Sequence, residues 1–290
     1  MVHYRALIIL EDKMKIISWN VANRIRKQPL QLDALVSKKP DIIGLQEVKR
    51  RALPLWVEGL KKEGYIHTIS SLGLHGGNSE STGARRYGVL IASRWPLELI
   101  DQYSLKIPFP ERFVSVLIHS PKIDFEFHVV HIPCGASHGW FKIKTFVGIY
   151  KFLAKENSKY PRVLCGDFNS PKAETKSGEV ITWGQKILAD GQVRIINRGG
   201  RGNAWDAGER SVIEGLAEYD LPDIFRLLNG YELQEFSWLF YLKGKIIANR
   251  RFDHIFASES LNPIRCRYIH SFREESLSDH SAIEATFNMK

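Results

Sequence analysis

The chain alternates between short apolar runs and longer segments with apolar residues at helical spacing. Short runs rich in β-branched and aromatic side chains predict buried strands. These are expected at Met14–Asn20, Asp41–Gln46, Tyr87–Ser93, Phe113–His119, Phe125–His131, Arg162–Gly166, Phe236–Leu242, Arg251–Ala257, Arg265–His270 and Ser281–Phe287. Helical spacing predicts amphipathic helices. These are expected at Leu30–Val36, Leu53–Lys62, Gly139–Lys155 and Glu209–Ala217.

The alternation of strands and helices is not interrupted by a repeat, a low-complexity tract or a linker. It predicts a single α/β domain with two packed sheets over residues 14–290, with residues 1–13 as an N-terminal extension. Residues 172–205 are rich in Gly, Lys and Arg and show little periodicity. Within them, Arg198–Asn203 (RGGRGN) is expected to be an exposed loop.

The composition is that of an ordinary globular protein, with 44% hydrophobic and 25% charged residues. Lysine and arginine together number 41, against 32 aspartates and glutamates, which gives a formal net charge of +9. A basic protein favours polyanions, so nucleic acid is the first partner to consider and an anionic membrane surface the second.

The three cysteines, Cys134, Cys165 and Cys266, lie far apart and form no CxxC pair. This pattern argues against a disulfide framework and fits a reducing compartment. The apolar run Ala6–Leu10 is too short for the core of a signal peptide or for a membrane span. We therefore expect a cytoplasmic protein with no stable membrane association. We also expect it to be a monomer.

Polar side chains follow or end several strongly apolar segments, where ligands commonly gather in α/β folds. They are Asn20, Glu47, His131, Asp167, Asn169, Asp253, Asp279 and His280. Carboxylates, amides and imidazoles without a cysteine suit Mg²⁺, Mn²⁺ or Ca²⁺ and not a structural zinc. An aspartate near an imidazole and a metal can activate water while amides hold phosphate oxygens. This set can therefore hydrolyse phosphodiesters.

Each motif taken alone also fits a structural role. Gly166–Asn169 (GDFN) has the composition of a turn. Glu47 suits a helix N-terminus or a surface ion pair, and Asp253 beside Arg251 suits a salt bridge. A lone histidine such as His131 is more often structural than catalytic. The combination of these motifs, in this order, is what predicts a functional site.

The series SWN, LQE, HIP, GDFN, RFD and SDH resembles the motifs of the endonuclease/exonuclease/phosphatase superfamily, from about Met14 to Phe287. The resemblance implies a four-layer α/β sandwich of the DNase I-like type, in which helices flank two packed mixed β-sheets. It places the site at one edge of the two sheets. It also implies a divalent-metal-dependent hydrolase of phosphoesters, with Mg²⁺ or Mn²⁺ as cofactor.

The resemblance carries roles over to the residues that match the motifs. Glu47 would be the main metal ligand, with Asn20 and Asp279 close to the metal and the phosphate. Asp167 would orient or deprotonate the attacking water. Asn169 would bind the phosphate or that water.

Histidines and an apolar pocket complete the implied site. His280 would contact the scissile phosphate, supported by a hydrogen bond to Asp253 that fixes its tautomer and favours its protonated form. His131 would lie by the leaving group and help to stabilise or protonate it. Trp238 and Phe252 match positions that form a pocket for a flipped sugar in abasic-site endonucleases.

Two segments are similar to the exonuclease III branch of the superfamily: Asp223–Trp238 (DIFRLLNGYELQEFSW) and Gly208–Arg210 (GER). Three positions depart from that branch, which usually has Tyr in place of His131, Asp in place of Ala22 and Trp in place of Arg250. The departures leave the superfamily assignment intact and the specificity for abasic sites open.

Basic clusters lie beside several of the motifs and would rim one face of the site if the motifs converge. Arg198, Arg201 and Arg250 are expected to contact the substrate, since such a rim can follow a phosphate backbone. The alternative is a generic basic surface.

Three functions compete on this sequence. The leading hypothesis is a DNA endonuclease or exonuclease of the exonuclease III type, with DNA favoured over RNA and DNA repair as the setting. The second is a phosphodiesterase or phosphatase acting on a small molecule or lipid phosphoester, which His131 and Ala22 motivate. The third, a non-catalytic nucleic-acid-binding relative, is disfavoured because every core residue is retained.

Overall fold

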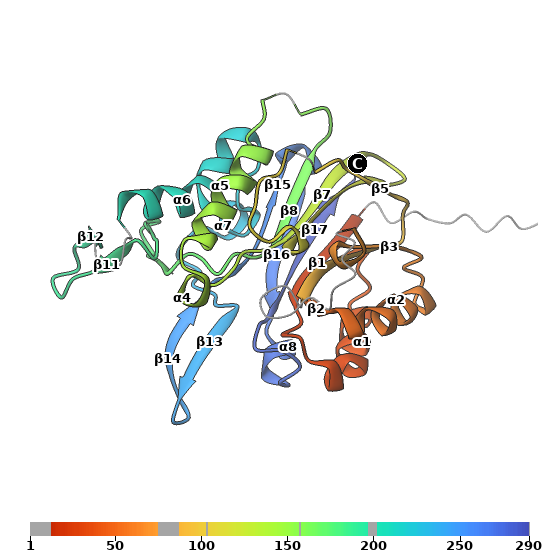
Figure 1. Cartoon of the computed structure of the whole chain (residues 1–290), viewed down its shortest axis with the longest axis horizontal. Coiled ribbons are helices and arrows are strands. Elements are labelled where there is room, and N and C mark those ends of the chain that lie inside the picture. The colour runs from red at the N-terminus through yellow and green to blue at the C-terminus, as the bar shows by residue number, and fades with distance from the viewer. Residues whose placement is uncertain (1–12, 75–86, 103, 157, 197–201, 290) are drawn as a thin grey trace, which may run out of the picture.

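The computed structural model describes residues 13–74, 87–102, 104–156, 158–196 and 202–289. Two β-sheets pack face to face, and helices cover their outer faces (Figure 1). The helices are α1 (Gln28–Val36), α2 (Leu53–Lys62), α3 (Ser71–Leu74), α4 (Gly135–His138), α5 (Phe141–Leu153), α6 (Asn203–Ile213), α7 (Ile224–Asn229) and α8 (Ser271–Glu274). This arrangement confirms the expected four-layer α/β sandwich.

The first sheet has six strands and joins both ends of the described chain. Its strand order is β16 (Pro263–Ile269), β17 (Ala282–Asn288), β1 (Lys13–Asn20), β2 (Ile42–Lys49), β4 (Tyr87–Ser93) and β3 (His67–Ser70). The pair β1–β2 is parallel and the other pairs are antiparallel.

The second sheet has five strands. Their order is β15 (Asp253–Ala257), β8 (Arg162–Asp167), β7 (Asp124–His131), β6 (Phe113–His119) and β5 (Leu97–Leu99). The pair β7–β8 is parallel and the others are antiparallel. Both sheets are therefore mixed, as expected.

Three two-stranded sheets lie outside this sandwich. They are β9 (Ala173–Glu174) with β10 (Val180–Ile181), β11 (Gln185–Ile187) with β12 (Val193–Ile195), and β13 (Trp238–Leu242) with β14 (Lys245–Arg250). The hairpins β11–β12 and β13–β14 stand out from the body of the molecule at the left of Figure 1.

The core between the sheets follows from the two-residue period of the strands. In β1, Ile16 belongs to the core shared with the second sheet, whereas Ile17 and Trp19 pack with residues of α1, α2 and α8. The sheets approach closely near the middle of β2. A Cβ built on Gly44 would lie 2.8 Å from Cγ2 of Val129 on β7.

Several expected elements have the predicted bounds, including Leu53–Lys62, Tyr87–Ser93 and Phe113–His119. The helix expected over Glu209–Ala217 was placed wrongly, because α6 begins at Asn203 and ends at Ile213. Its buried face carries Gly208 and Glu209 beside Trp205 and Val212, so the apolar stripe is interrupted by a glycine and a charge.

Other elements were not anticipated. Residues 172–205 contain β9 to β12 and the start of α6, where little structure was expected. The strands β3, β5 and β14 were also missed, and most of the loop Arg198–Asn203 lies outside the described residues. Among the helices that the structure describes, none is long and apolar enough to cross a membrane.

Candidate active site

Four of the predicted site residues stand at the same edge of the two sheets. Asn20 ends β1, His131 ends β7 and Asp167 ends β8, while Asp253 begins β15 and is paired with Asp167 across the β8–β15 ladder. Each lies an even number of residues from an inter-sheet core residue of its own strand. Side chains two residues apart share a face, so all four point into the space between the sheets.

Glu47 reaches the same space because a β-bulge interrupts β2. Leu45 and Val48 both pack on the outer face of the sheet, although a regular strand would alternate them. The register against β4 shifts between these two residues, and Glu47 has φ +57°. In a regular strand Glu47 would share the outer face with Leu45. The bulge turns its carboxylate inward, as bulges near active sites commonly do.

Two asparagine amides hold the Glu47 carboxylate. Asn20 Nδ2 donates to Oε1 at 3.3 Å, and Asn23 Nδ2 donates to Oε2 at 3.0 Å. Asn23 and Ala22 both have positive φ, at 48° and 52°, in the tight turn that follows β1. The Asn20 amide oxygen accepts from the Ala22 backbone N–H at 2.9 Å. Asn20 thus contacts Glu47 through its nitrogen, and Asn23 is a site residue that the sequence did not reveal.

Asp167 is presented by a turn that requires glycine before it. Gly166 has φ +145°, and a Cβ at this position would lie 1.9 Å from the carbonyl oxygen of Val130 on β7. After Asp167, the chain turns through Asn169, which has φ +51°. The GDFN motif is therefore a turn, as its composition suggests, and it also carries a predicted catalytic carboxylate into the space between the sheets.

Three hydrogen bonds orient the Asp167 carboxylate. Its Oδ1 accepts from the Asn169 backbone N–H at 2.8 Å. Its Oδ2 accepts from Asn20 Nδ2 at 3.0 Å and from Asn169 Nδ2 at 3.3 Å. Burial raises the pKa of Asp167 to about 7, helped by the nearby Asp253 charge and opposed by His280 and the hydrogen bonds. A carboxylate with a pKa near 7 can accept a proton effectively at neutral pH.

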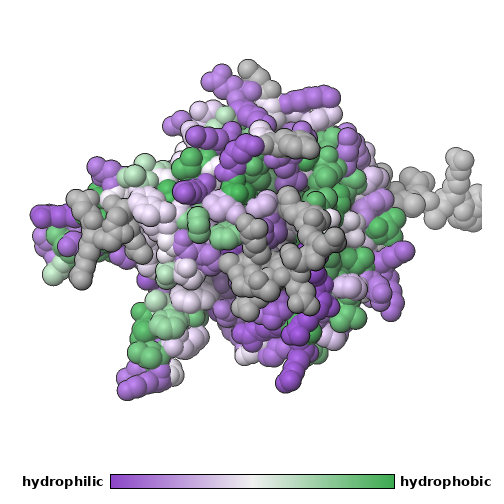
Figure 2. Space-filling view, in the orientation of Figure 1, coloured by the Kyte–Doolittle hydropathy of each residue, from purple (hydrophilic) through white to green (hydrophobic). Residues whose placement is uncertain are grey.

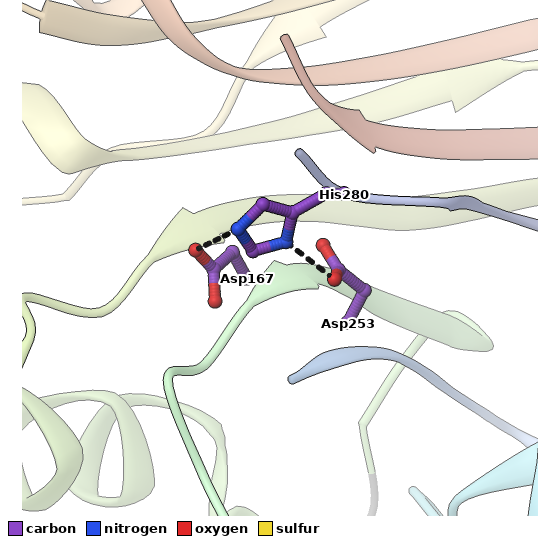
Figure 3. Close-up of side chains that lie close together, drawn as sticks. All are labelled: Asp167, Asp253 and His280. Carbon is purple, nitrogen blue, oxygen red and sulfur yellow. Dashed lines mark hydrogen bonds and ion pairs between the residues drawn. The ribbon is translucent and has the colours of Figure 1, made fainter. Parts of the chain in front are cut away.

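His280 lies between two carboxyl groups (Figure 3). Its Nδ1 is 2.8 Å from Asp253 Oδ2, and its Nε2 is 3.9 Å from Asp167 Oδ2. Burial alone would lower the pKa of His280, but the Asp253 and Asp167 charges raise it to about 10. His280 is therefore an imidazolium at neutral pH. The backbone N–H of Asp253 donates a hydrogen bond to Ser237 Oγ at 3.1 Å, which holds Asp253 in position.

His131 has the opposite electrostatic environment. Its Nε2 lies 3.6 Å from Glu47 Oε1 and 3.8 Å from Asp167 Oδ2. Burial holds the pKa of His131 well below 6.5, and the positive charges of Arg112 and His280 lower it further. A neutral His131 can offer a hydrogen bond at neutral pH, but it holds no excess proton to transfer.

Asp167, Asp253 and His280 also have one potential metal-ligand atom each within 4.8 Å of one another. A metal ion among these three is disfavoured, because the Asp253–His280 hydrogen bond occupies the facing atoms. A protonated imidazole is also no ligand, since metal binding requires the neutral ring. The oxygen donors that do suit a hard cation are the Glu47 carboxylate and the exposed Asp279, which line the same cavity.

A cavity of about 680 Å³ opens at this edge of the sheets, and most predicted site residues line it. Those lining it are Glu47, His131, Asp167, Asn169, Trp238, Phe252, Asp279 and His280. Asn20 and Asp253 do not line it and instead hold the side chains that do. The sequence motifs therefore converge on one cavity.

The predicted basic residues are only partly described by the structure. Arg250 does not line the cavity, but its guanidinium lies 5.6 Å from the ring centroid of Trp183, which does. Arg198 and Arg201 lie outside the described residues, so their predicted contact with substrate stays a prediction.

A buried ion pair beside the cavity was not anticipated. Lys142 Nζ lies 2.9 Å from Glu209 Oε1, and both side chains are almost fully buried. Lys142 also donates to the Asn169 carbonyl at 2.8 Å, and Trp183 Nε1 donates to the same oxygen at 3.0 Å. The pair therefore supports the turn that carries Asp167. The one sequence signal was a lysine in the apolar stripe that continues to Phe146 on α5.

Arg112 is a second cation that the sequence did not reveal. It ends a 3₁₀ helix (Pro110–Arg112), is buried and lines the cavity. Burial lowers the pKa of Arg112 below its usual value, while the charges of Glu47 and Asp167 oppose that effect. It remains a cation at neutral pH, facing the two carboxylates.

Comparisons with known proteins agree with this architecture. Exodeoxyribonuclease III of Haemophilus influenzae is 28% identical over 293 residues, which cover 94% of this chain and 100% of that protein. An AP endonuclease from Archaeoglobus fulgidus has a similar structure, with a TM-score of 0.64 and 21% identity over 95% of this chain and 99% of its own. A 3′ phosphatase from Neisseria, whose structure contains a product DNA hairpin, has a TM-score of 0.64. It is 22% identical over 94% of this chain and 99% of its own.

Residues 17–280 match the Endonuclease/Exonuclease/phosphatase family, a span that runs from β1 to His280 and includes every strand-end motif described above. Its members are hydrolytic nucleases and phosphatases, so the protein is an enzyme. The chain belongs to the Endonuclease/Exonuclease/phosphatase family.

Proposed function

We propose that this enzyme is a divalent-metal-dependent phosphodiesterase that hydrolyses nucleic acid, with DNA favoured over RNA, in the manner of exonuclease III. The observation that carries the proposal is the pairing of Asp167 with His280. A carboxylate whose pKa is about 7 lies 3.9 Å from an imidazolium, at the edge of a cavity that also holds Glu47. A proton acceptor and a fixed positive charge are what hydrolysis of a phosphodiester requires.

Asp167 is the proposed general base. Asp167 lines the cavity and its Oδ2 accepts hydrogen bonds from the amides of Asn20 and Asn169, so the carboxylate is oriented before a substrate arrives. Water beside Oδ2 would lose its proton to this oxygen while the water oxygen attacks phosphorus, and the bond from phosphorus to the leaving oxygen would break. Because the pKa of Asp167 is about 7, a substantial fraction is ionised at neutral pH.

Cations are proposed to stabilise the charge that develops on the phosphate. His280 Nε2 can donate to a phosphate oxygen, since Asp253 occupies Nδ1 and keeps the ring protonated. Arg112 offers a guanidinium on the wall of the same cavity, and guanidinium groups bind phosphate oxygens in pairs. Neutral His131 is proposed to donate a hydrogen bond to the leaving oxygen.

The side chains fit a hard divalent cation such as Mg²⁺ or Mn²⁺. Both oxygens of Glu47 are oriented by amides, and Asp279 offers a second, exposed carboxylate to the cavity. Mg²⁺ is bound by one or two carboxylates together with water and substrate phosphate, which matches this donor set. When bound by Glu47 and Asp279, near Asn20, the ion would supply Lewis-acid polarisation of the phosphate.

Nucleic acid is supported as the substrate by charge and by the relatives. The chain carries a net charge of +9, which favours a polyanion. The Haemophilus influenzae relative is named for exonuclease activity on DNA, and the Neisseria structure contains DNA. Trp238 and Phe252 line the cavity and would accept a sugar or base drawn out of the helix.

The test is a cleavage panel with purified protein. The substrates are abasic duplex, nicked duplex, single-stranded DNA, RNA and sphingomyelin, each with Mg²⁺ or Mn²⁺ and each repeated with EDTA. We expect metal-dependent cleavage of at least one DNA substrate, and Asp167→Asn prepared in parallel reveals any contaminating nuclease. Cleavage that persists in EDTA contradicts the metal mechanism.

A phosphodiesterase or phosphatase acting on a small or lipid phosphoester is the second candidate. The histidine at position 131 favours it, because the exonuclease III branch usually has a tyrosine there. Hydrolysis of sphingomyelin with no cleavage of any nucleic acid would establish this alternative and reject the first.

A further inference from the structure

The hairpin formed by β13 and β14 exposes an unusual number of large apolar side chains. It projects from the body as a two-stranded sheet that no further described strand joins (Figure 1). The exposed fractions are 46% for Phe240, 54% for Tyr241, 54% for Leu242, 53% for Ile246 and 53% for Ile247. Figure 2 shows the hairpin as a hydrophobic projection with a hydrophilic tip. A patch of this kind commonly marks a binding surface.

The pairing of the two strands sorts these side chains onto two faces. Trp238 is paired with Arg250 and Phe240 with Ala248, and paired residues share a face. Tyr241 is paired with Ile246, and because it follows Phe240 in β13 it points to the opposite face. The register shift adds its extra residue to β14, so the alternation along β13 is unbroken.

Three aromatic rings form a continuous stack from the cavity onto the first of these faces. The rings of Phe252 and Trp238 lie 5.5 Å apart between centroids, at an interplanar angle of 29°. The rings of Trp238 and Phe240 lie 5.9 Å apart at 5°. Phe252 and Trp238 line the cavity, whereas Phe240 is almost half exposed on the hairpin. We call these three residues the aromatic ladder.

Positive charge accompanies the aromatic ladder. Arg250 lies opposite Trp238, and the exposed Lys243 and Lys245 lie at the tip of the hairpin. No aspartate or glutamate occurs between Trp238 and Arg250. Stacking rings beside cations are the combination that binds single-stranded nucleic acid, because every base has a face to stack and every phosphate a charge to neutralise.

We propose that the aromatic ladder binds unpaired nucleotides next to the scissile phosphate, with bases stacking from the cavity along Phe240. The proposal rests on the proposed function and narrows its substrate to nucleic acid with a single-stranded flank. Continuity with the catalytic cavity is the reason to favour nucleic acid over a protein partner. A base that leaves the cavity beside Trp238 meets Phe240 as the next ring.

The test measures binding of the full chain in EDTA, so that no substrate is consumed. Fluorescence anisotropy compares one duplex in three forms: blunt, with a thymidine tail of about six nucleotides, and with a tail of abasic spacers of equal length. Tails are placed on either the 3′ or the 5′ end. The variant is Phe240→Ala, and the matched control is Tyr241→Ala, an aromatic of similar exposure on the opposite face.

We expect the wild-type protein to prefer the thymidine tail over both the spacer tail and the blunt end. Phe240→Ala should lower the ratio of tailed to blunt affinity roughly 5-fold to 100-fold, since one stacked base is lost. Tyr241→Ala should leave that ratio unchanged.

Three results would overturn the proposal. Equal affinity for thymidine and spacer tails would mean that only phosphates are bound. An equal loss of affinity in both variants, for blunt and tailed duplex alike, would mean that the hairpin binds the duplex and not the tail. No loss of affinity in either variant would mean that the hairpin does not bind nucleic acid, and a protein partner would then be the alternative. If the enzyme cleaves blunt duplex and a tail does not change binding, the role of the aromatic ladder is rejected and the proposed function stands. If binding depends on the tail but no substrate is cleaved, only the proposed function is rejected.

Discussion

Replacement of Glu174 by glutamine should destabilise the protein, although Glu174 does not line the cavity. Glu174, on β9, accepts from Arg251 Nε and Nη2 at 2.6 Å each and from Arg226 Nη2 at 2.8 Å. Its side chain is only 4% exposed. Arg251 directly precedes Phe252 and Asp253, so this ion pair fixes the start of the strand that carries the partner of His280.

The size of the effect follows from the pKa of Glu174. Burial alone would raise this pKa, but Arg251 and Arg226 lower it from 4.5 to about 2. A tenfold change in an acid dissociation constant corresponds to about 1.4 kcal/mol, so the carboxylate contributes about 3 kcal/mol to the free energy of unfolding. A second route agrees, because removal of one partner from a buried ion pair typically costs about 3–5 kcal/mol.

The sign of the pH dependence is fixed by the direction of this shift. Because the pKa of Glu174 is lower in the folded than in the unfolded state, its contribution is fully present above pH 4.5 and is lost as the pH falls toward 2. Urea unfolding followed by tryptophan fluorescence should therefore show Glu174→Gln less stable by about 3 kcal/mol at neutral pH, and the difference should shrink in acid.

Glu179→Gln is the matched control, because Glu179 is an exposed carboxylate of the same segment. Its effect on the urea midpoint should be small at every pH. A Glu174→Gln protein as stable as wild type at neutral pH would refute the reasoning. So would a stability difference that is the same at pH 7 and in acid.

Three further predictions concern the site itself. Asp167→Asn should lower kcat by about 10²- to 10⁴-fold in the cleavage assay without lowering the melting temperature, and near-normal turnover would mean that another group activates water. Lys142→Met should lower the free energy of unfolding in urea by about 3–5 kcal/mol. The double variant with Glu209→Gln should lose less than the sum of the two single variants; additive losses in this double-mutant cycle would contradict a coupled pair. Gly166→Ala should prevent formation of a stable fold, because its Cβ would lie 1.9 Å from the Val130 carbonyl; a wild-type melting temperature would show that β8 can move away.

The sequence predicted the part of the site that depends on strand periodicity. Four site residues end or begin apolar strands: Asn20, His131, Asp167 and Asp253. Each lies an even number of residues from apolar core residues of its own strand, so its side chain points into the space between the sheets. Glu47 was predicted by its motif, but its inward position depends on the bulge, which strict alternation does not reveal.

The rest of the site depends on contacts between segments distant in sequence. The Lys142–Glu209 pair joins two helices across 67 positions, and neither residue stands in a motif that requires the other. Arg112 belongs to a short 3₁₀ helix without a periodic pattern. Strand β14 was missed because Lys245–Arg250 pairs only with β13 and buries little apolar surface to mark it.

The division of the site between the two sheets has a consequence for folding. Asn20 and Glu47 come from the first sheet, Asp167 and Asp253 from the second, and the Asn20–Asp167 hydrogen bond joins residues 147 positions apart. Neither sheet alone holds the proposed general base, Asp167, beside the proposed metal ligand, Glu47. An intermediate with both sheets formed but not docked therefore has native secondary structure and no turnover, and long-range contacts of this kind form slowly. During refolding, the time course of regained activity should therefore report when the two sheets dock.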